Sequence, residues 1–481
     1  MKPRLVSCAI ILTLSLGALN AVHADSATWN LNPTSGDWNT AANWTPQTIP
    51  NGPDDIATFG VSSQTAVSLS LPVGVDSVVF SPGASAFTIY SSPVINLAIS
   101  GAGIVNNSGI TQNFVANPTT ETSVAGGITF SNSATAGSNV VITVVGSGDE
   151  KGDGGEVLFH DSASADHAVF NVLGALGGYP ATLGFYNAST AGNATITVHQ
   201  YGFLVADSTS APFPTLGNAV VTNSGGIIDV FDGATAGRAT IINTADSQNV
   251  YSDMEIGSGE AGIVASAGDA TIINQGATAT SSASETIFLQ TATAGKAVIT
   301  CNGTDGPRKL AGAVLFGFIN STDIGTADHA TLIANGGTNG GNGGLIIFKE
   351  NSVGGVARCE LFGNGTLDIS QHLGTGVTTG SIEGDGVVSL GGLNLTIGAN
   401  KLETVFSGVI QDGGLGGGGG GSLTKIGPAT FIVSGANSYT GGTIVNAGAL
   451  VVNNITGSGT GTGAVNVNAG TLGAREPLQG Q

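Results

Sequence analysis

The sequence predicts an all-β protein, a right-handed parallel β-helix or β-solenoid with an N-terminal cap and a C-terminal β-strand repeat. Three observations point to this fold class. Short runs rich in Val, Ile and Thr are separated by Gly and Asn, which is the pattern of strands and turns. Segments with the apolar period and capping residues of helices are scarce. A turn motif recurs at steps of 20 to 33 residues, which suits one turn of a solenoid.

Residues 1–24 have the features of a secretory signal peptide. Lys2 and Arg4 supply its positive charge, and the apolar run that follows is too short for a stable membrane span. Small residues place the cleavage between Ala24 and Asp25. We therefore expect an exported chain without a transmembrane segment.

The segment 25–115 holds all three tryptophans, Trp29, Trp38 and Trp44. One interpretation is a platform on which sugar rings stack. The favoured interpretation is a terminal β cap whose aromatic side chains cover the first open turn, because the ends of a solenoid need covering.

The segment 116–412 carries the repeat of about 27 residues. Clear copies read Thr-Ala-Gly-Asn-Ala-Thr-Ile from Thr190 and Thr-Ala-Gly-Arg-Ala-Thr-Ile from Thr235. The glycine or aspartate in the middle of the motif fits a corner between two faces, because both residue types tolerate positive φ. We expect these corner residues to fall in line along one edge of the coil: Asp166, Gly192, Gly217, Gly237, Gly268, Gly295, Asp328 and Gly355.

Asparagines follow the strand in several copies of the repeat. In a stacked coil they would form an amide ladder, whereas as solvated turn residues they would each be favoured for local reasons. The sequence leaves both interpretations open for Asn223, Asn243, Asn274, Asn302 and Asn335.

The C-terminal part begins with a glycine run, 413–421, which reads as a flexible linker, and ends in a tail, 474–481. Between them, 422–473 resembles the autotransporter-associated β-strand repeat, also called the passenger-associated transport repeat. The matching residues are Leu423-Thr424-Lys425, Gly427, Ser434-Gly435-Ala436-Asn437, Tyr439-Thr440-Gly441-Gly442-Thr443, Asn446-Ala447-Gly448 and Leu450.

The resemblance implies a parallel β-helix passenger, related to the pectin lyase-like architecture, in which the repeat assists export or folding. The sequence holds one convincing copy of the repeat. Only eight residues follow Gly473, so a C-terminal translocator barrel is not expected in this sequence.

Charge and composition exclude several functions. Loss of Lys2 and Arg4 with the signal peptide takes the formal charge from −20 to −22, which repels nucleic acid and anionic membranes. We expect no cofactor and no metal site. The acidic segment 149–156 lacks the spacing of a calcium loop, and the histidines form no pair at metal-ligand spacing. Cys301 and Cys359 are expected to be two small buried residues, with a disulfide as the alternative.

Catalytic residues are not expected. The candidate groupings are Asp229 with Asp232, and Lys349 and Glu350 near Arg358, and solvated loop charges are the favoured interpretation of both.

Taken together, these features predict an exported structural or adhesive passenger, secreted or at the outer surface of the cell. Its partners would be the export machinery and the outer membrane or surface glycans. The alternatives are a polysaccharide-active β-helix enzyme, a lyase or glycosidase, and a carbohydrate-binding protein.

Overall fold

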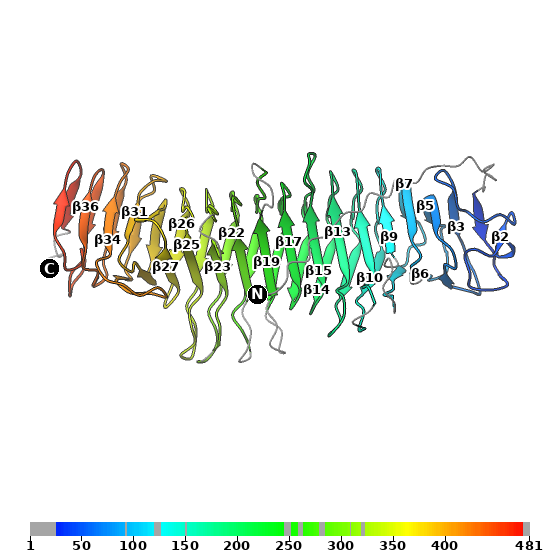
Figure 1. Cartoon of the computed structure of the whole chain (residues 1–481), viewed down its shortest axis with the longest axis horizontal. Coiled ribbons are helices and arrows are strands. Elements are labelled where there is room, and N and C mark those ends of the chain that lie inside the picture. Colours follow the sequence, from blue (N-terminus) through cyan, green and yellow to red (C-terminus); the bar gives the residue numbers. More distant parts are fainter. Residues whose placement is uncertain are drawn as a thin grey trace, which may run out of the picture.

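The computed structural model shows an extended rod made of successive turns of β-strands (Figure 1). It describes residues 26–91, 94–119, 127–149, 152–244, 252–257, 263–278, 284–307, 309–318 and 323–474. The predicted signal peptide and the predicted cleavage site between Ala24 and Asp25 lie outside these residues. So do positions 150 and 151 of the acidic segment and the tail from residue 475.

One long sheet, sheet A, runs along the rod. Except for the antiparallel pair β1–β2, its neighbouring strands are parallel. Its strands are β1 (Ala27–Trp29), β2 (Trp44–Thr45), β3 (Ile56–Phe59), β5 (Val73–Phe80), β7 (Leu97–Asn106), β9 (Gly127–Phe130), β11 (Glu156–Phe159), β13 (Thr182–Tyr186), β15 (Phe203–Asp207), β17 (Ile227–Phe231), β19 (Ser252–Gly257), β21 (Ser284–Phe288), β23 (Ala313–Phe316), β25 (Leu345–Glu350), β27 (Thr366–His372), β30 (Val387–Ser389) and β33 (Val409–Gln411).

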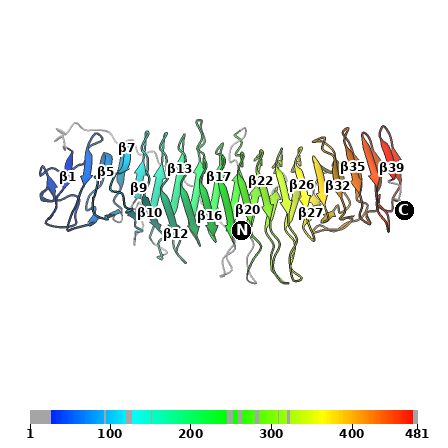
Figure 2. The same cartoon turned by 180° about the vertical axis from the view of Figure 1, so that it is seen from behind.

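A second parallel sheet, sheet B, forms the opposite wall of the coil (Figure 2). Its strands are β4 (Ala66–Ser68), β6 (Thr88–Ser91), β8 (Gln112–Ala116), β10 (Val140–Val145), β12 (Val169–Leu173), β14 (Thr195–His199), β16 (Val220–Ser224), β18 (Thr240–Thr244), β20 (Thr271–Asn274), β22 (Val298–Cys301), β24 (Thr331–Ala334), β26 (Arg358–Leu361), β29 (Ser381–Gly384), β32 (Thr404–Phe406), β35 (Thr430–Val433), β37 (Ala449–Val452) and β39 (Thr471–Ala474).

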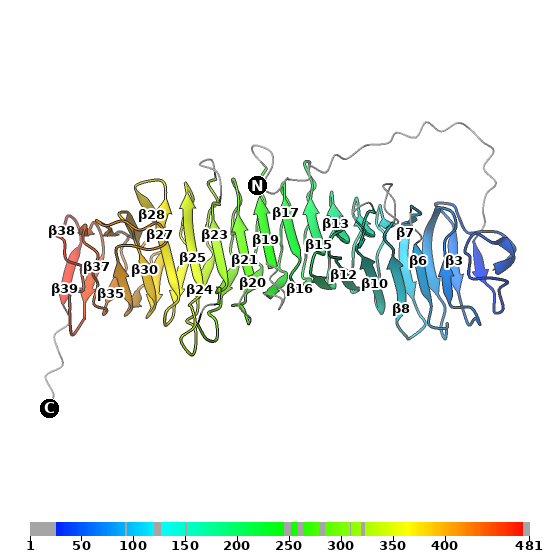
Figure 3. The ribbon, with the colours of Figure 1, turned by 60° about the horizontal axis from the view of Figure 1, so that its bottom comes forward.

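A third, shorter sheet, sheet C, begins beside β27 and continues to the C-terminal end of the rod (Figure 3). It consists of β28 (Gly376–Thr378), β31 (Asn394–Ile397), β34 (Ser422–Lys425), β36 (Gly442–Val445) and β38 (Val465–Val467). One short 3₁₀ helix, η1 (Ala41–Asn43), lies in the N-terminal segment. The all-β solenoid expected from the sequence is thus confirmed, and its right-handedness stays a prediction.

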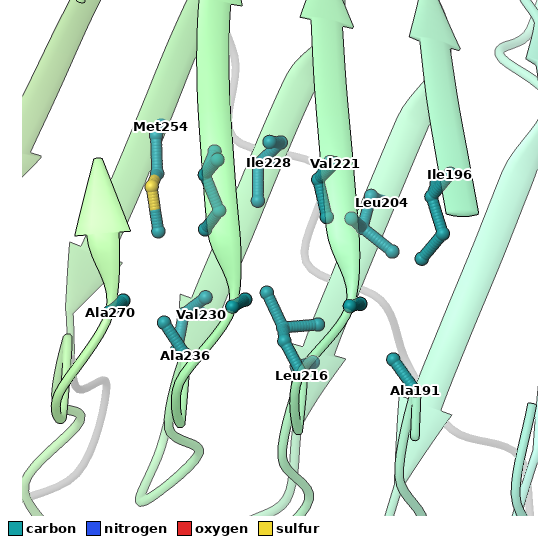
Figure 4. Packing of buried hydrophobic residues seen from close by; sticks show 14 of the residues in the cluster. Ala191, Ile196, Leu204, Leu216, Val221, Ile228, Val230, Ala236, Met254 and Ala270 are labelled. Carbon is teal, nitrogen blue, oxygen red and sulfur yellow. The ribbon is translucent and has the colours of Figure 1, made fainter. Parts of the chain in front are cut away.

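Alternation of side chains explains how such short strands build a core. In β17, Ile228 and Val230 are buried, whereas Ile227, Asp229 and Phe231 lie on the outer face. Figure 4 shows Leu204, Ile228 and Met254 of sheet A inside the coil with Ile196 and Val221 of sheet B. A one-residue shift in pairing would turn every one of these side chains to the wrong face, so the burial pattern fixes the register.

Identical side chains stack along the interior because successive turns are in register. Phe130, Phe159 and Phe185 are stacked with ring centroids 4.6 and 5.0 Å apart. A second stack joins Phe288, Phe316 and Phe348. Stacked aromatic rings contribute beyond their buried area, so these ladders hold neighbouring turns together.

Two boundaries differ from the sequence expectation. Parallel pairing starts at β3, and β5 and β7 continue it, so the coil already begins inside the segment assigned to the cap. The glycine run 413–421 is an ordered loop and not a flexible linker. Its backbone N–H groups donate to Asp368 at 2.8 Å and Ser370 at 2.7 Å, and β34 beyond it pairs with β31. The sequence did not show these partners because they lie about 45 residues upstream.

Candidate functional site

The corner residues of the repeat lie in one row along the coil, and all eight have positive φ, between 49° and 65°. The turn motif begins with Thr or Ser, and these residues form single bridges from turn to turn, for example between Thr190 and Thr215 and between Thr215 and Thr235. The corner N–H of Gly237 donates to Thr235 Oγ1 at 3.0 Å, and the other predicted corners from Asp166 to Asp328 repeat this bond. The sequence carries this signal in the recurrent Thr or Ser two residues before the corner glycine or aspartate.

Stacking of the corners also limits their size. A Cβ on Gly237 would lie 2.8 Å from the carbonyl oxygen of Gly217, and one on Gly268 would lie 2.7 Å from that of Gly237. Glycine at Gly237 and Gly268 therefore suits both the positive φ and the close approach of the preceding turn, whereas Asp166 and Asp328 adopt the same φ at two other corners.

The three tryptophans form a plug at the N-terminal end and not a sugar platform. Trp38 and Trp44 are fully buried and Trp29 is 2% exposed, so no ring face is presented to a ligand. Ring centroids of Trp29 and Trp38 lie 5.0 and 5.1 Å from that of Trp44. Each indole N–H donates to a backbone carbonyl, that of Trp38 to Pro50 at 3.0 Å and that of Trp44 to Trp38 at 2.7 Å.

The asparagines that follow the strands form amide ladders, which was one of the two interpretations left open by the sequence. Asn223 donates to Asn243 at 3.2 Å, Asn243 donates to Asn274 at 2.8 Å, and all three side chains are fully buried. Asn274 continues the row toward Cys301 Sγ at 4.0 Å. A second, half-buried ladder has Asn335 donating to Asn302 at 2.8 Å. Buried amides that are satisfied in this way fix the register of the turns.

The two cysteines are free and fully buried. Cys301 faces Ala334 of the next strand in sheet B, and Cys359 faces Leu332, so a whole strand separates the two thiols. Burial raises the pKa of both thiols to about 12. The favoured prediction of small buried residues agrees with this geometry, and the disulfide does not.

The predicted charge groupings are only partly brought together. Lys349 and Glu350 lie at the end of β25 in sheet A, whereas Arg358 lies in β26 of sheet B and pairs with Glu360 and Glu383. That grouping is therefore not a site. Asp229, in contrast, is in register with Glu255 of the neighbouring strand, a partner that the sequence analysis missed.

We call the outer surface of sheet A around this pair the acidic face. It is formed by outward side chains of β15, β17, β19 and β21, namely Asp207, Asp229, Asp253, Glu255 and Glu285. Four of these five residues were not predicted. The sequence shows only that each carboxylate occupies an outward position in the alternation of its strand. Which carboxylates lie side by side depends on the register of the coil.

Crowding and burial perturb these acids. Burial, and then the carboxylate of Asp232, raises the pKa of Asp207 to about 6. Burial raises the pKa of Asp229 well above its usual value, and Glu255, Asp207 and Asp253 add to the shift by repulsion. The Oδ1 atoms of Asp207 and Asp229 are buried and accept no hydrogen bond.

An apolar strip continues the acidic face along sheet A. It consists of the outward residues Ile287, Leu289, Ala313, Leu315 and Ile347, against which Phe231 and Leu345 pack. Lys349 lies at the far end of the strip, with Nζ 5.3 Å from the ring centroid of Phe318. The face is therefore acidic at one end and apolar at the other.

Metal ligands are not assembled in the described part of the chain, where no group of three or more His, Cys, Asp or Glu residues is placed to hold an ion. His167 and His329 are exposed next to the corners, and each contacts the preceding aspartate at 2.6 Å.

The C-terminal repeat joins successive turns through buried polar side chains. The Asn437 side chain accepts from Ile410 N–H at 2.8 Å and donates to Gly459 O at 2.7 Å. Lys425 is buried and donates to three carbonyl oxygens, among them Gly427 at 2.9 Å and Ala447 at 3.3 Å. Desolvation lowers the pKa of Lys425. The repeat thus hydrogen-bonds the last turns of the same coil to one another and does not form a separate domain.

Comparison with known proteins identifies one matching segment. Residues 423–452 match the family of the passenger-associated-transport-repeat, which confirms the resemblance found in the sequence. No curated protein and no solved structure matches the chain. Among the described residues, no helix is long and apolar enough to cross a membrane.

Proposed function

We propose that the chain is an exported passenger-type scaffold, released or displayed at the outer surface of the cell, that acts by presenting the faces of a rigid rod. The observation that supports this most directly is the passenger-associated transport repeat at 423–452, built into the end of a parallel β-solenoid. Its partners would be the export machinery and the outer membrane or surface glycans. We propose no catalytic role.

The repeat would assist export by helping the terminal turns to fold. The Asn437 side chain is hydrogen-bonded to the turn before it and to the turn after it, and the Lys425 ammonium donates to three carbonyl oxygens at a corner. Because buried polar groups are costly unless all their partners are in place, these residues favour a single stacking of the last turns.

Cell fractionation of the full chain tests export. Mass spectrometry of the surface and medium fractions should find a mature N-terminus at Asp25. A chain that keeps residues 1–24 and stays in the cytoplasm would contradict the proposal.

Substitution in the repeat tests its role. Lys425→Met should lower the exported, protease-resistant yield several-fold, whereas Lys296→Met, at an exposed position of the same coil, should leave it unchanged. Equal yields would show that the repeat has no part in export or folding. Incubation of the purified protein with a polysaccharide panel should release neither reducing sugars nor unsaturated products.

A further inference from the structure

Sheet B carries a regular outer face over six successive strands, from β14 to β24 (Figure 2). In each of these strands the first and third residues point outward, whereas the second is fully buried. The first positions form one row: Thr195, Val220, Thr240, Thr271, Val298 and Thr331. The third positions form a second row: Thr197, Thr222, Ile242, Ile273, Thr300 and Ile333. We call these two rows the threonine face.

Every side chain of the threonine face is β-branched. Each strand supplies at least one threonine, and the other outward residue of the pair is Thr, Val or Ile. Branching at Cβ restricts χ1, and the strands pair from β14 to β24 without a shift in register. Neighbouring strands are about 4.8 Å apart, and alternate residues of one strand are about 6.6 Å apart. The face is therefore a stiff array of hydroxyl and methyl groups with a short repeat in both directions.

The preference of strands for β-branched residues does not by itself explain this array. Sheet A passes through the same turns of the coil, and its outward positions there include Asp229 and Glu255. The array in sheet B ends at β26, where the corresponding outward residues are Arg358 and Glu360. Because both sheets need strand-forming residues, the uniform composition of the threonine face indicates a requirement set by what lies against it.

The hydroxyl groups of the threonine face are not used inside the coil. In the corner motif, by contrast, Thr190 Oγ1 accepts from Gly192 N–H and Thr235 Oγ1 accepts from Gly237 N–H, both at 3.0 Å. In the part of the chain that the structure describes, no side-chain hydrogen bond engages a threonine hydroxyl of the two rows. Since a hydroxyl both donates and accepts, the face is open to a ligand in both roles.

Charge limits which ligand can lie on this face. The chain has a formal net charge of −20, yet neither row contains an ionisable side chain. Arg238, Asp269 and Lys296 lie at its edge, two positions before the first row, and Arg238 contacts Asp269 at 3.9 Å. Covering a charge without a partner is costly, so the face suits an uncharged ligand. A ligand that meets all six strands in the same way repeats over equally short distances.

We propose that the threonine face binds the surface of an ice crystal. Ice is uncharged, repeats in two directions, and consists of molecules that donate and accept hydrogen bonds as a hydroxyl group does. A liquid water molecule loses entropy when a surface immobilises it, whereas the molecules of ice are already ordered. A stiff array can therefore form many contacts with ice at little further cost in entropy.

A crystalline polysaccharide is another neutral, repeating surface. The two rows offer it neither the aromatic rings nor the convergent amide and carboxylate groups that orient small organic units. The observations therefore favour ice. The inference goes beyond the display of rod faces, and its failure would leave the proposed export untouched, because ice binding is measured on the purified chain.

Partition into slowly growing ice tests the proposal. The melted ice fraction should contain at least fivefold more of the full chain than of serum albumin frozen at the same concentration. Val220→Lys combined with Val298→Lys places two ammonium groups on the face and should reduce this enrichment at least fivefold. Exclusion of the wild-type chain from ice to the level of albumin would overturn the proposal.

The matched control is Ile227→Lys combined with Ile56→Lys, at outward positions of sheet A. Val220 and Val298 are 45% and 38% exposed, and Ile227 and Ile56 are 43% and 38% exposed, so both double variants make the same change at equally open sites. The control should alter enrichment in ice less than twofold. Equal losses in the two double variants would overturn the site, because binding would then follow net charge alone.

Further measurements separate the array from a folding defect and from other ligands. Val220→Thr keeps the branch at Cβ and should retain enrichment within twofold, and its loss at an unchanged melting temperature would contradict the array. Cosedimentation with microcrystalline cellulose or chitin that only the Val220→Lys, Val298→Lys variant loses would overturn ice in favour of a polysaccharide. A wild-type dimer that this variant converts to a monomer, seen by analytical ultracentrifugation, would overturn ice in favour of a second copy of the chain.

Discussion

Asn243 donates to Asn274 Oδ1 at 2.8 Å across one step of the coil, and both side chains are fully buried. Asn243 also accepts from Asn223, so it occupies the middle of the ladder. Removing it leaves polar atoms of both neighbours without a partner. Asn243→Ala should therefore lower the free energy of unfolding by about 2 kcal/mol, measured by urea denaturation.

The matched control for the ladder is Asn193→Ala. Asn193 accepts from Asn218 at 3.2 Å on the exposed surface, so its loss should cost less than about 0.5 kcal/mol. Similar losses for the two variants would mean that the buried ladder does not stabilise the coil.

Gly237 should not tolerate a side chain. Its φ is 65°, and an added Cβ would lie 2.8 Å from the Gly217 carbonyl oxygen. Gly83 has a φ of 75° but open space around its Cβ position. Gly237→Ala should lower the melting temperature more than Gly83→Ala, because Gly83→Ala introduces only the φ strain of roughly 1 kcal/mol. Calorimetry gives the comparison, and equal shifts would contradict the stacking argument.

The acidic face should make stability depend on pH. Burial raises the folded-state pKa of Asp207 to about 6, above the value of about 3.9 in an unfolded chain. The folded chain therefore binds the proton more tightly, and stability rises as the pH falls from 7 to 4. Asp207→Asn should increase the free energy of unfolding at pH 7.5 by ~1 kcal/mol, after allowance for solvent screening, and by less at pH 4.5.

Asp269→Asn is the control for this pH effect, because Asp269 is exposed and contacts Arg238 at 3.9 Å. It removes the same charge from the exposed surface, so it should change the free energy of unfolding at pH 7.5 by less than about 0.5 kcal/mol. A profile of Asp207→Asn that is parallel to that of the wild type would contradict the assignment.

The cysteines should be unreactive in the folded chain. Burial raises the pKa of the Cys301 and Cys359 thiols to about 12, so the thiolate is scarce at pH 8 and is also shielded. Alkylation followed by mass spectrometry should label neither native thiol within an hour and both in urea. Recovery of a peptide cross-linked through the two cysteines before reduction would contradict the free-thiol geometry.

The tryptophan plug should contribute stability and not glycan binding. Trp44→Ala removes a fully buried ring that contacts Trp29 and Trp38, and should cost about 3–5 kcal/mol. The intrinsic fluorescence of the native chain should be strongly blue-shifted. If Trp44→Phe abolished binding of the chain to a glycan column without lowering its stability, the tryptophans would have a binding role.

The sequence predicted the parts of the fold that depend on local chemistry. The corner residues from Asp166 to Gly355 stood out because positive φ restricts the residue types allowed there. The structure also decided between the two interpretations of the asparagines, which the local sequence could not separate. Whether Asn243 is solvated or buried depends on Asn223 and Asn274, 20 and 31 residues away.

The acidic face escaped the sequence analysis for the same physical reason. Asp229 and Glu255 are separated by one circuit of the coil, which passes through β18, and only the register of β17 with β19 brings them together. The glycine run was misinterpreted because composition alone does not reveal a carboxylate such as Asp368 that captures its backbone N–H groups.

The spacing of the turns has a consequence for how the molecule is made. Beside the corners, Thr190 bridges to Thr215 and Thr215 bridges to Thr235. Each of these residues therefore pairs with a residue one circuit away in the chain. A chain that threads through a narrow pore one end first can complete each circuit as soon as it emerges. The strands of each completed circuit then pair with those of the next. The folded part of the chain outside the pore is too wide to pass back through it.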